Sequence, residues 1–411
     1  MNAQADLHKI VEDGLCLGCG LCAALAPEAI MMGQGEDGDL RPFANQHFTQ
    51  EQMAVTEQVC PSLRVEGLPE EIGASASCHD VVWGPFEEMS LAHASDAKIR
   101  HEASTAGILT MLAIQLVESG TVDAILHVKA ADHPANFGVA TISRTRDEIL
   151  TGAGSRYGPT AALVSIEAVL SSHERFAVVA KPCDLNALRN LAHLDNRVDE
   201  RIPYFLTMLC GGFQPDEAFR AFLSERGYSH EGLQQVRYRG FGCPGPTSLT
   251  FEDGQKTAFH YLDFWGEDES QWSMPLRCKI CPDGIGEAAD IVAGDAWSGA
   301  SPDRVESETD LGINSVITRT KKGEALYQAA IEAGLITKTQ IVDCAFMSDV
   351  QPHQVTKKLA GQARAKGLAD AGSVAPELVN LRAEALSHML GSKAFDAQRY
   401  GTHQRALKAK R

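Results

Sequence analysis

The cysteine run near the amino terminus constrains this chain more than any other sequence feature. Cys16, Cys19 and Cys22 are separated by two residues each, and Cys60 follows with a proline directly after it. Two-residue gaps let three thiolates surround one corner of a cubane cluster, and the interspersed glycines let backbone N–H groups approach its sulfides. Zinc sites favour two separated Cys-x-x-Cys pairs, which this run does not provide. We therefore expect these four cysteines to hold a 4Fe–4S cluster rather than zinc.

The other cysteines and the charge narrow the class of protein. The chain has 11 cysteines and no basic or apolar leader at its start. In a reducing cytosol, such cysteines are metal ligands or catalytic groups more often than disulfide partners. The net charge of −17 repels phosphate backbones, so nucleic acid is not an expected partner. No stretch approaches 18 uninterrupted apolar residues, so we predict no membrane span and a cytoplasmic protein.

Composition and periodicity divide the chain into three predicted domains. Residues 1–75 hold the cysteine run, an acidic Gly-rich turn and a linker of small residues. Residues 80–350 alternate helical and strand patterns, which predicts an α/β domain with a mixed sheet. Residues 351–411 are rich in Ala, Lys and Arg and are predicted to be a helical extension. Within the central domain we expect helices over 105–118, 160–171 and 185–194, and strands over 122–128, 176–180 and 204–209.

The spacing of a second group of cysteines is compatible with more than one kind of site. Cys278 and Cys281 form a single Cys-x-x-Cys pair, which is compatible with zinc, a redox-active thiol pair or no function. Cys183 and Cys210 each follow a predicted strand, and sites in α/β sheets are built at the carboxyl ends of strands. The four cysteines are therefore candidates for a second cluster. The alternative for Cys183 and Cys210 is that they are small buried residues.

Several short motifs occur in an order that resembles one protein family. They are Ser104-Thr-Ala-Gly107, Ser155-Arg-Tyr157, Lys181-Pro-Cys183, Leu209-Cys-Gly-Gly212, Tyr238–Gly245, Cys278-Lys-Ile-Cys281 and Ala289–Trp297. Together they resemble the coenzyme F420 hydrogenase/dehydrogenase β-subunit family over residues 10–325. The amino-terminal segment resembles a 4Fe–4S ferredoxin domain. With this segment, the chain resembles members such as 7-hydroxymethyl chlorophyll a reductase and divinyl chlorophyllide reductase more than it resembles the short hydrogenase subunit.

The resemblance implies two kinds of cofactor. It implies FAD in a mixed α/β domain that is not a Rossmann fold, and a second 4Fe–4S cluster on Cys183, Cys210, Cys278 and Cys281. It assigns FAD contacts to Arg100, Ser104, Thr105, Gly107, Ser155 and Tyr157. A helix start at Ser104–Gly107 suits a pyrophosphate, because free N–H groups and the helix dipole attract anions. Without the resemblance, Ser104 and Thr105 are simply candidates for a helix cap.

Some positions depart from the family pattern or keep two interpretations. Ala106 replaces the first residue of an expected Gly-Gly pair, and Cys243 stands where many members have Trp. Lys181 replaces an apolar residue; it either lies beside the flavin, where its charge stabilises an anionic reduced form, or is exposed. Arg156 is expected to pair with a phosphate or with a surface carboxylate. These departures put the substrate in doubt more than the cofactors.

A few other polar residues lie near the predicted flavin region. One of His93, His101 and His127 is a candidate proton donor, although a surface or core role is the simpler interpretation of each. Asp184 and Asp295 are candidates for polar groups beside the cluster and the flavin, or for structural caps.

These features predict a flavin- and iron–sulfur-dependent reductase. Single electrons arrive from ferredoxin or another one-electron donor, and FAD delivers two of them as a hydride to a small-molecule substrate. The alternative is an electron-transfer subunit with no substrate of its own, which serves a partner redox subunit of a hydrogenase or dehydrogenase. The resemblance leaves room for a homo-oligomer. The substrate and the direction of electron flow do not follow from the sequence.

Overall fold

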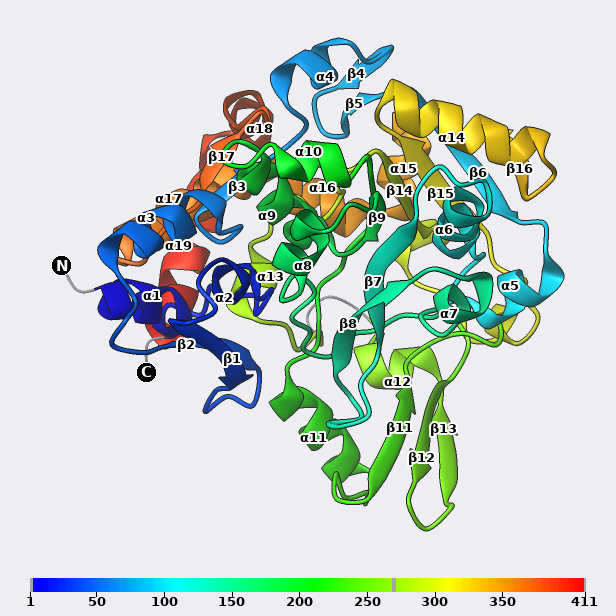
Figure 1. Cartoon of the computed structure of the whole chain (residues 1–411), viewed down its shortest axis with the longest axis horizontal. Coiled ribbons are helices and arrows are strands. Elements are labelled where there is room, and N and C mark those ends of the chain that lie inside the picture. Colours follow the sequence, from blue (N-terminus) through cyan, green and yellow to red (C-terminus); the bar gives the residue numbers. More distant parts are fainter. Residues whose placement is uncertain (1–2, 268–270, 410–411) are drawn as a thin grey trace.

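An eight-stranded mixed sheet forms the centre of the molecule. The computed structural model describes residues 3–267 and 271–409. The strand order of the sheet is β16-β6-β15-β14-β10-β9-β7-β8 (Figure 1). The strands are β6 (Glu88–Ala94), β7 (Ala124–Ala130), β8 (Gly138–Ser143), β9 (Phe176–Val179), β10 (Tyr204–Met208), β14 (Ile291–Asp295), β15 (Asn314–Thr318) and β16 (Ile336–Ile341).

The four inner strands β7, β9, β10 and β14 are parallel, and antiparallel neighbours extend the sheet on both sides. This arrangement confirms the expected α/β class with a mixed sheet, and its strand order differs from the parallel order 3-2-1-4-5-6 of a Rossmann fold. Because β9, β10 and β14 run in the same direction, the segments that follow them emerge at one edge of the sheet.

Helices cover both faces of the sheet. Along the inner strands, neighbouring residues such as Ala177 and Val178 point to opposite faces and belong to two separate apolar clusters. One cluster packs against α6 (Ile108–Glu118) and α14 (Lys321–Glu332). The other packs against α8 (Ile166–Ser171) and α9 (Pro182–Ala192).

The expected helix over 160–171 is shorter than predicted, since only α8 (Ile166–Ser171) is helical. In the preceding segment, the backbone N–H of Leu163 donates to the carbonyl of Cys19 at 2.8 Å rather than to a helical partner. Contact with the cysteine run therefore overrides the local helical pattern. The expected helix over 185–194 begins earlier, at Pro182, where the fixed φ of proline favours a helix start.

The two ends of the chain pack together (Figure 1). The amino-terminal elements are α1 (Ala3–Glu12), α2 (Leu21–Leu25), β1 (Ile30–Gln34), β2 (Leu40–Ala44), α3 (Gln50–Val59) and β3 (Arg64–Glu66). The carboxyl-terminal elements are α16 (Pro352–Leu359), α17 (Gly361–Asp370), β17 (Glu377–Val379), α18 (Ala383–Leu390) and α19 (Ser392–Ala409). Strand β17 pairs in parallel with β3, and Leu368 and Ala406 share an apolar cluster with Leu7 and Ile10. The helical carboxyl-terminal segment thus completes the core of the amino-terminal part.

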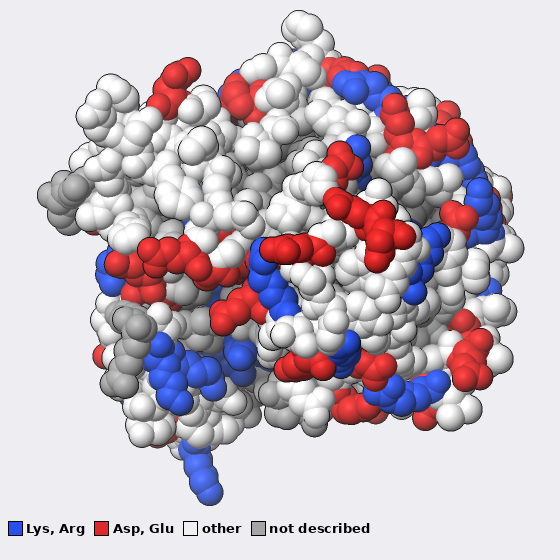
Figure 2. Space-filling model, turned by 90° about the horizontal axis from the view of Figure 1, so that it is seen from below, with Lys and Arg blue, Asp and Glu red and all other residues white. Residues whose placement is uncertain are grey.

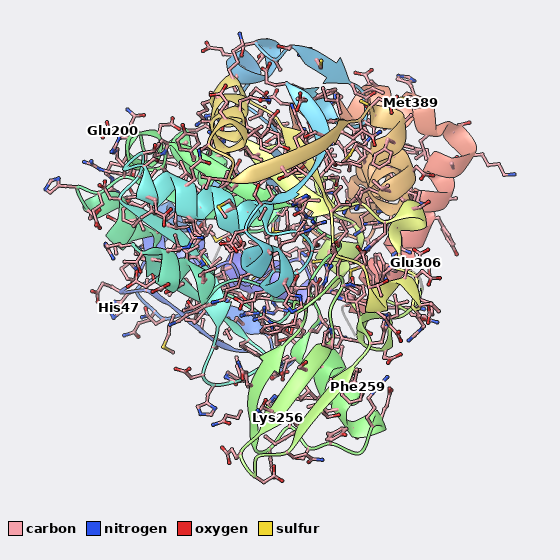
Figure 3. The ribbon with its side chains drawn as sticks, turned by 90° about the vertical axis from the view of Figure 1, so that its right-hand side faces the viewer. His47, Glu200, Lys256, Phe259, Glu306 and Met389 are labelled. Atoms are coloured by element: carbon pink, nitrogen blue, oxygen red, sulfur yellow. The ribbon has the colours of Figure 1, made fainter. Side chains whose placement is uncertain are left out.

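A small lobe projects below the sheet, with Lys256 and Phe259 near its end (Figure 3). It consists of α11 (Asp216–Glu225), α12 (Tyr261–Trp265) and a three-stranded antiparallel sheet of β11 (Leu233–Arg237), β12 (Thr247–Phe251) and β13 (Lys256–Phe259). Its core is aromatic and reaches Tyr157, whose ring meets that of Trp265 edge-on at 4.8 Å.

The remaining elements are short. They are α4 (Glu70–Ala74), β4 (Cys78–Asp80), β5 (Gly84–Phe86), α5 (Ala97–Glu102), α7 (Arg146–Leu150), α10 (Arg197–Arg201), α13 (Leu276–Lys279), α15 (Cys344–Val350), and the 3-10 turns η1 (Ser298–Ala300) and η2 (Glu306–Glu308).

Acidic and basic side chains are interspersed on the face seen in Figure 2. Within residues 3–267 and 271–409, every helix is too short or too polar to cross a lipid bilayer.

Candidate functional site

The first cysteine set surrounds one small cavity. Cys16, Cys19, Cys22 and Cys60 all line this space of about 30 Å³, together with apolar side chains of the amino-terminal part. Gly20 precedes α2 with φ of +86°, and a Cβ there would lie 3.1 Å from atoms of Ala161 and Val164. Glycine therefore lets the cysteine run lie close against the segment that precedes α8. Helix α3 ends at Cys60, and burial raises the pKa of its thiol to about 11.

The second cysteine set is assembled from three separate segments. Cys183 lies in the first turn of α9, Cys210 follows β10, and Cys278 and Cys281 lie in and just after α13. These thiols are close enough to act on one another electrostatically: burial first, and then Cys278 and Cys281, raise the pKa of Cys210 to about 12. The structure thus brings together the four cysteines that spacing alone left open.

Three residues join the two cysteine sets. Leu17 packs with Phe213, Cys278 and Cys183 in one apolar cluster. Arg277 donates from Nη2 to the carbonyl of Pro61 at 2.7 Å, and it also hydrogen-bonds Cys281. Asp184 acts on both Cys19 and Cys183, and its negative charge adds to the burial that raises the pKa of each thiol.

The donor chemistry fits iron–sulfur clusters. Among the described residues, no three His, Cys, Asp or Glu side chains are grouped to hold a metal ion. A 4Fe–4S cubane is wider than one ion, so its sulfur ligands stand farther apart than those of a mononuclear site. Each of the two sets offers four thiols, which is the ligand number that a cubane takes.

A larger cavity of about 300 Å³ opens at the carboxyl edge of the parallel strands, a size typical of small-molecule sites. Cys210 of the second set lines it, so the cavity and this set share a wall. The structure places most of the predicted flavin contacts in its lining, namely Ser104, Thr105, Gly107, Ser155, Arg156, Tyr157 and Lys181.

Arg100 lies outside the cavity lining. Its guanidinium donates from Nη2 to the carbonyl of Gly312 at 2.6 Å and from Nε to the carbonyl of Leu311 at 3.0 Å. It therefore fastens α5 to the loop before β15 rather than facing the cavity.

One wall of the cavity suits a phosphate-bearing ligand. Helix α6 starts after Gly107, whose φ is +79° and which supplies no side-chain cap. Ser104, Thr105 and Ser155 add hydroxyl groups to this wall. Within the described part of the chain, Arg156 has no ion-pair partner, and its Nε has no hydrogen-bond partner. Burial and the nearby Arg237 lower the pKa of Arg156 to about 10, so an anionic ligand would satisfy it.

Arg239, which is buried, and Asp295, whose side chain is 23% exposed, form an ion pair in this wall; no role for Arg239 was predicted from the sequence. Arg239 donates from both Nη atoms to the carboxylate of Asp295 at 3.0 Å, and its Nη2 also donates to the carbonyl of Ser104 at 2.8 Å. Thr105 also donates its hydroxyl to Asp295. Although burial opposes its charge, Asp295 keeps the pKa of Arg239 well above the usual value. The only signal in the sequence was the position of Arg239 inside the Tyr238–Gly245 motif.

Aromatic residues line the other part of the cavity. They are Tyr261, Trp265, Trp272 and Trp297. Trp265 is buried, and its Nε1 has no hydrogen-bond partner in the described residues. Flat apolar walls with a few unpaired donors are suited to a planar heteroaromatic ring.

The histidines differ in position. His127 lines the cavity and exchanges a hydrogen bond with the hydroxyl of Ser143 at 2.8 Å, while burial lowers its pKa to about 4. His93 and His101 do not line the cavity. His353, which the sequence did not indicate, lies in the lining beside Trp272, and burial lowers its pKa to about 3.

Lys181 and Cys243 are both placed by the structure. Lys181 lies in the cavity wall and pairs with Asp184 at 2.8 Å. Burial opposes its charge, but Asp184 raises the pKa of Lys181 above its ordinary value. Cys243 is buried behind the wall, and burial raises the pKa of its thiol to about 12.

Comparison with known proteins identifies the class. The family model of the coenzyme F420 hydrogenase/dehydrogenase β-subunit amino-terminal region matches residues 89–167, and that of the carboxyl-terminal region matches residues 173–343. The two matches cover more than half of the chain. The chain belongs to the coenzyme F420 hydrogenase/dehydrogenase β-subunit family.

Individual relatives are distant. The chain is 23% identical to the coenzyme F420-dependent sulfite reductase of Methanocaldococcus jannaschii over 79% of its own length, but it spans only 47% of that protein. It is 23% identical to the coenzyme F420 hydrogenase subunit β of Methanothermobacter thermautotrophicus, covering 62% of this chain and 85% of the relative. These relatives support a redox role and do not support the chlorophyll-reductase type.

The fold itself has a solved counterpart. A chain in the F420-reducing [NiFe] hydrogenase complex of Methanosarcina barkeri matches with a TM-score of 0.54 and 20% identity, over 70% of this chain and 95% of that one. At this identity the match describes the fold alone.

Proposed function

We propose that this protein is an electron-transfer subunit of a larger redox complex. In this proposal, Cys16, Cys19, Cys22 and Cys60 hold one 4Fe–4S cluster, and Cys183, Cys210, Cys278 and Cys281 hold a second. The 300 Å³ cavity binds FAD. The observation that carries the proposal is continuity: Leu17 and Arg277 join the two thiol sets, and Cys210 belongs to both the second set and the cavity wall.

FAD would supply the exchange between one-electron and two-electron chemistry. The protein's own residues bind and orient it: Arg156 and the start of α6 meet the phosphates, and the Arg239–Asp295 pair fixes the Ser104–Thr105 turn. The aromatic side chains keep water from one side of the cavity. Lys181 places a positive charge in the wall next to Cys183, where an anionic reduced ring would be stabilised.

The subunit interpretation is preferred over the free-standing reductase, because relatives of this chain include a hydrogenase subunit. We also propose that the two-electron partner at the cavity is a deazaflavin of the F420 type, in line with the names of these relatives. The one-electron partner would be another redox subunit or a ferredoxin-like carrier.

The test begins with protein purified without oxygen, followed by measurement of iron, sulfide, zinc and flavin. About eight irons, eight sulfides and one FAD per chain are expected from two cubanes and one flavin. F420 is then offered together with dithionite or with a candidate partner subunit. Zinc without flavin would refute the redox proposal. Rapid turnover of a small molecule other than F420 by the isolated chain would favour the reductase instead.

A further inference from the structure

Helix α16 (Pro352–Leu359) extends the second cysteine site beyond the region that the family models match, which ends at residue 343. Three of its polar side chains are buried: Gln354, Lys357 and Lys358. Two of them face the loop that carries Cys210. Gln354 donates from Nε2 to the carbonyl of Cys210 at 2.8 Å, and Lys357 donates from Nζ to the carbonyl of Gly211 at 2.8 Å.

Lys357 is a buried charge without a carboxylate of its own. Only 5% of its surface is exposed, and among the ion pairs of the described residues it has no acidic partner, unlike the neighbouring Lys358, which pairs with Glu287. A buried charge is costly unless other charges or hydrogen bonds compensate it. The groups near Lys357 include the backbone carbonyl of Gly211, the ring of His353, and the thiols of Cys210 and Cys278, whose negative forms Lys357 favours.

Positive charge also reaches the second set from two other elements. Arg277 of α13 is buried and hydrogen-bonds Cys281. Lys181 acts on Cys183 and Cys210 from the start of α9. Asp184 opposes these cations, since its carboxylate faces Cys183 and pairs with Lys181.

The cations near the first cysteine set are already engaged. Arg41 acts on Cys16 and is shared between Asp37 and Asp39 at 2.6 and 3.3 Å, and Arg277 reaches this set only through the carbonyl of Pro61. Asp184 acts on Cys19 with negative charge. Burial, and then Cys16 and Cys60, raise the pKa of the Cys22 thiol; burial raises the pKa of Cys60, and a backbone hydrogen bond from Ser62 opposes this.

We infer that Lys357 makes the second cysteine site the higher-potential of the two, so that an electron shared between the clusters resides on the second. The inference rests on the proposed cluster assignment. Reduction adds one negative charge to a cubane, and a nearby fixed cation stabilises that charge in a low-dielectric interior. In the transfer itself, one electron leaves the first cluster, which is oxidised by one unit, and enters the second, which is reduced by one unit. Lys357 is thus a positioning residue that sets a potential and touches no substrate.

The experiment is a redox titration of the full-length holoprotein, followed by electron paramagnetic resonance. The variants C19S and C278S assign the two signals. In the wild-type protein, the second cluster is expected to have the higher midpoint potential. The variant K357M is expected to lower that potential by about 59 mV, a tenfold change in electron sharing for a one-electron couple, and to leave the first cluster unchanged. The variant K357R keeps the charge and is expected to restore the wild-type value, while K393M, an exposed lysine of α19, is the matched control.

Two outcomes overturn the inference: a second cluster with the lower potential in the wild-type protein, or a K357M variant with both potentials unchanged. A lower potential of the second cluster in the wild-type protein overturns the inference even if K357M does not fold. A protein without two clusters would instead refute the proposed function, so the two failures are distinguishable by iron content.

Discussion

The two cysteine sites are built in different ways, although each collects four thiols. The first takes three of them from the Cys16–Cys22 run and the fourth from the end of α3. The second draws on the ends of β9 and β10 and on α13, and a helix from the far end of the chain covers it. Three ligands of the first site are fixed by one short run, whereas the second site is assembled entirely from segments that the central domain brings together. The second site also shares a wall with the large cavity, and the first does not.

The largest expected effect separates the two sites by iron content. Replacing Cys19 with serine removes one thiolate of the first set, and replacing Cys210 removes one of the second. Each variant is expected to lose about four of about eight irons, because a cubane needs its full ligand set. Only C210S is also expected to lose FAD, since Cys210 lines the cavity. Iron and flavin analysis of the anaerobic proteins measures both. Equal flavin content in C19S and C210S would contradict the prediction that only the second cysteine site affects FAD binding.

The ion pair in the cavity wall gives the next effect. Changing Arg239 to glutamine leaves Asp295 without its bidentate partner; Arg239 is buried, whereas the side chain of Asp295 is 23% exposed. Breaking one side of a buried pair costs about 3–5 kcal/mol, and the partial exposure of Asp295 places the cost at or below the lower end of this range. Chemical denaturation is expected to show a loss of up to about 3 kcal/mol, together with weaker FAD binding. The control R144Q breaks an exposed pair with Glu174, for which about 1 kcal/mol or less is expected. An R239Q variant as stable as R144Q would mean that Asp295 finds another partner.

The contact between the two sites is tested at Leu17. The variant L17A removes a buried side chain that packs against Phe213 and Cys278, and Leu-to-Ala changes in cores cost about 2–5 kcal/mol. We also expect slower reduction of the second cluster in rapid mixing with a one-electron donor that enters at the first. The exposed Leu407 provides the matched control, as L407A. Normal kinetics in L17A would indicate that electrons reach the second cluster by another route.

The smallest expected effect is on the pH dependence of stability, and it arises at His127 in the wall of the large cavity. The pKa of His127 falls from 6.5 to about 4 on folding, because burial disfavours its charged form. The unfolded chain therefore binds more protons than the folded one between pH 6.5 and 4, and stability decreases as the pH falls through this window. The difference is up to about 3 kcal/mol. The H127N variant is expected to have a flatter profile of unfolding free energy against pH. Identical slopes in variant and wild type would refute this role.

The sequence predicted different parts of these sites to different extents. The first set followed from spacing, because a short run of cysteines fixes its own geometry. The strand positions of Cys183 and Cys210 made their convergence foreseeable, since parallel strands end at one edge. Arg239 and Asp295 lie far apart in sequence, so neither residue revealed the pair. The contribution of Lys357 and His353 could not be foreseen, because a helical pattern does not tell which distant loop a helix covers. The family resemblance assigned Arg100 to FAD binding, but in the structure its guanidinium donates to the backbone carbonyls of Leu311 and Gly312.

The pairing of β17 with β3 has a consequence for biosynthesis. The residues of the first cysteine set are synthesised well before Leu368 and Ala406, which fill the adjacent apolar core. Domains that emerge first usually fold first. Here the core around the first cysteine set closes only when the helices that carry Leu368 and Ala406 have emerged, so its four thiols stay accessible for longer than those of a self-contained domain.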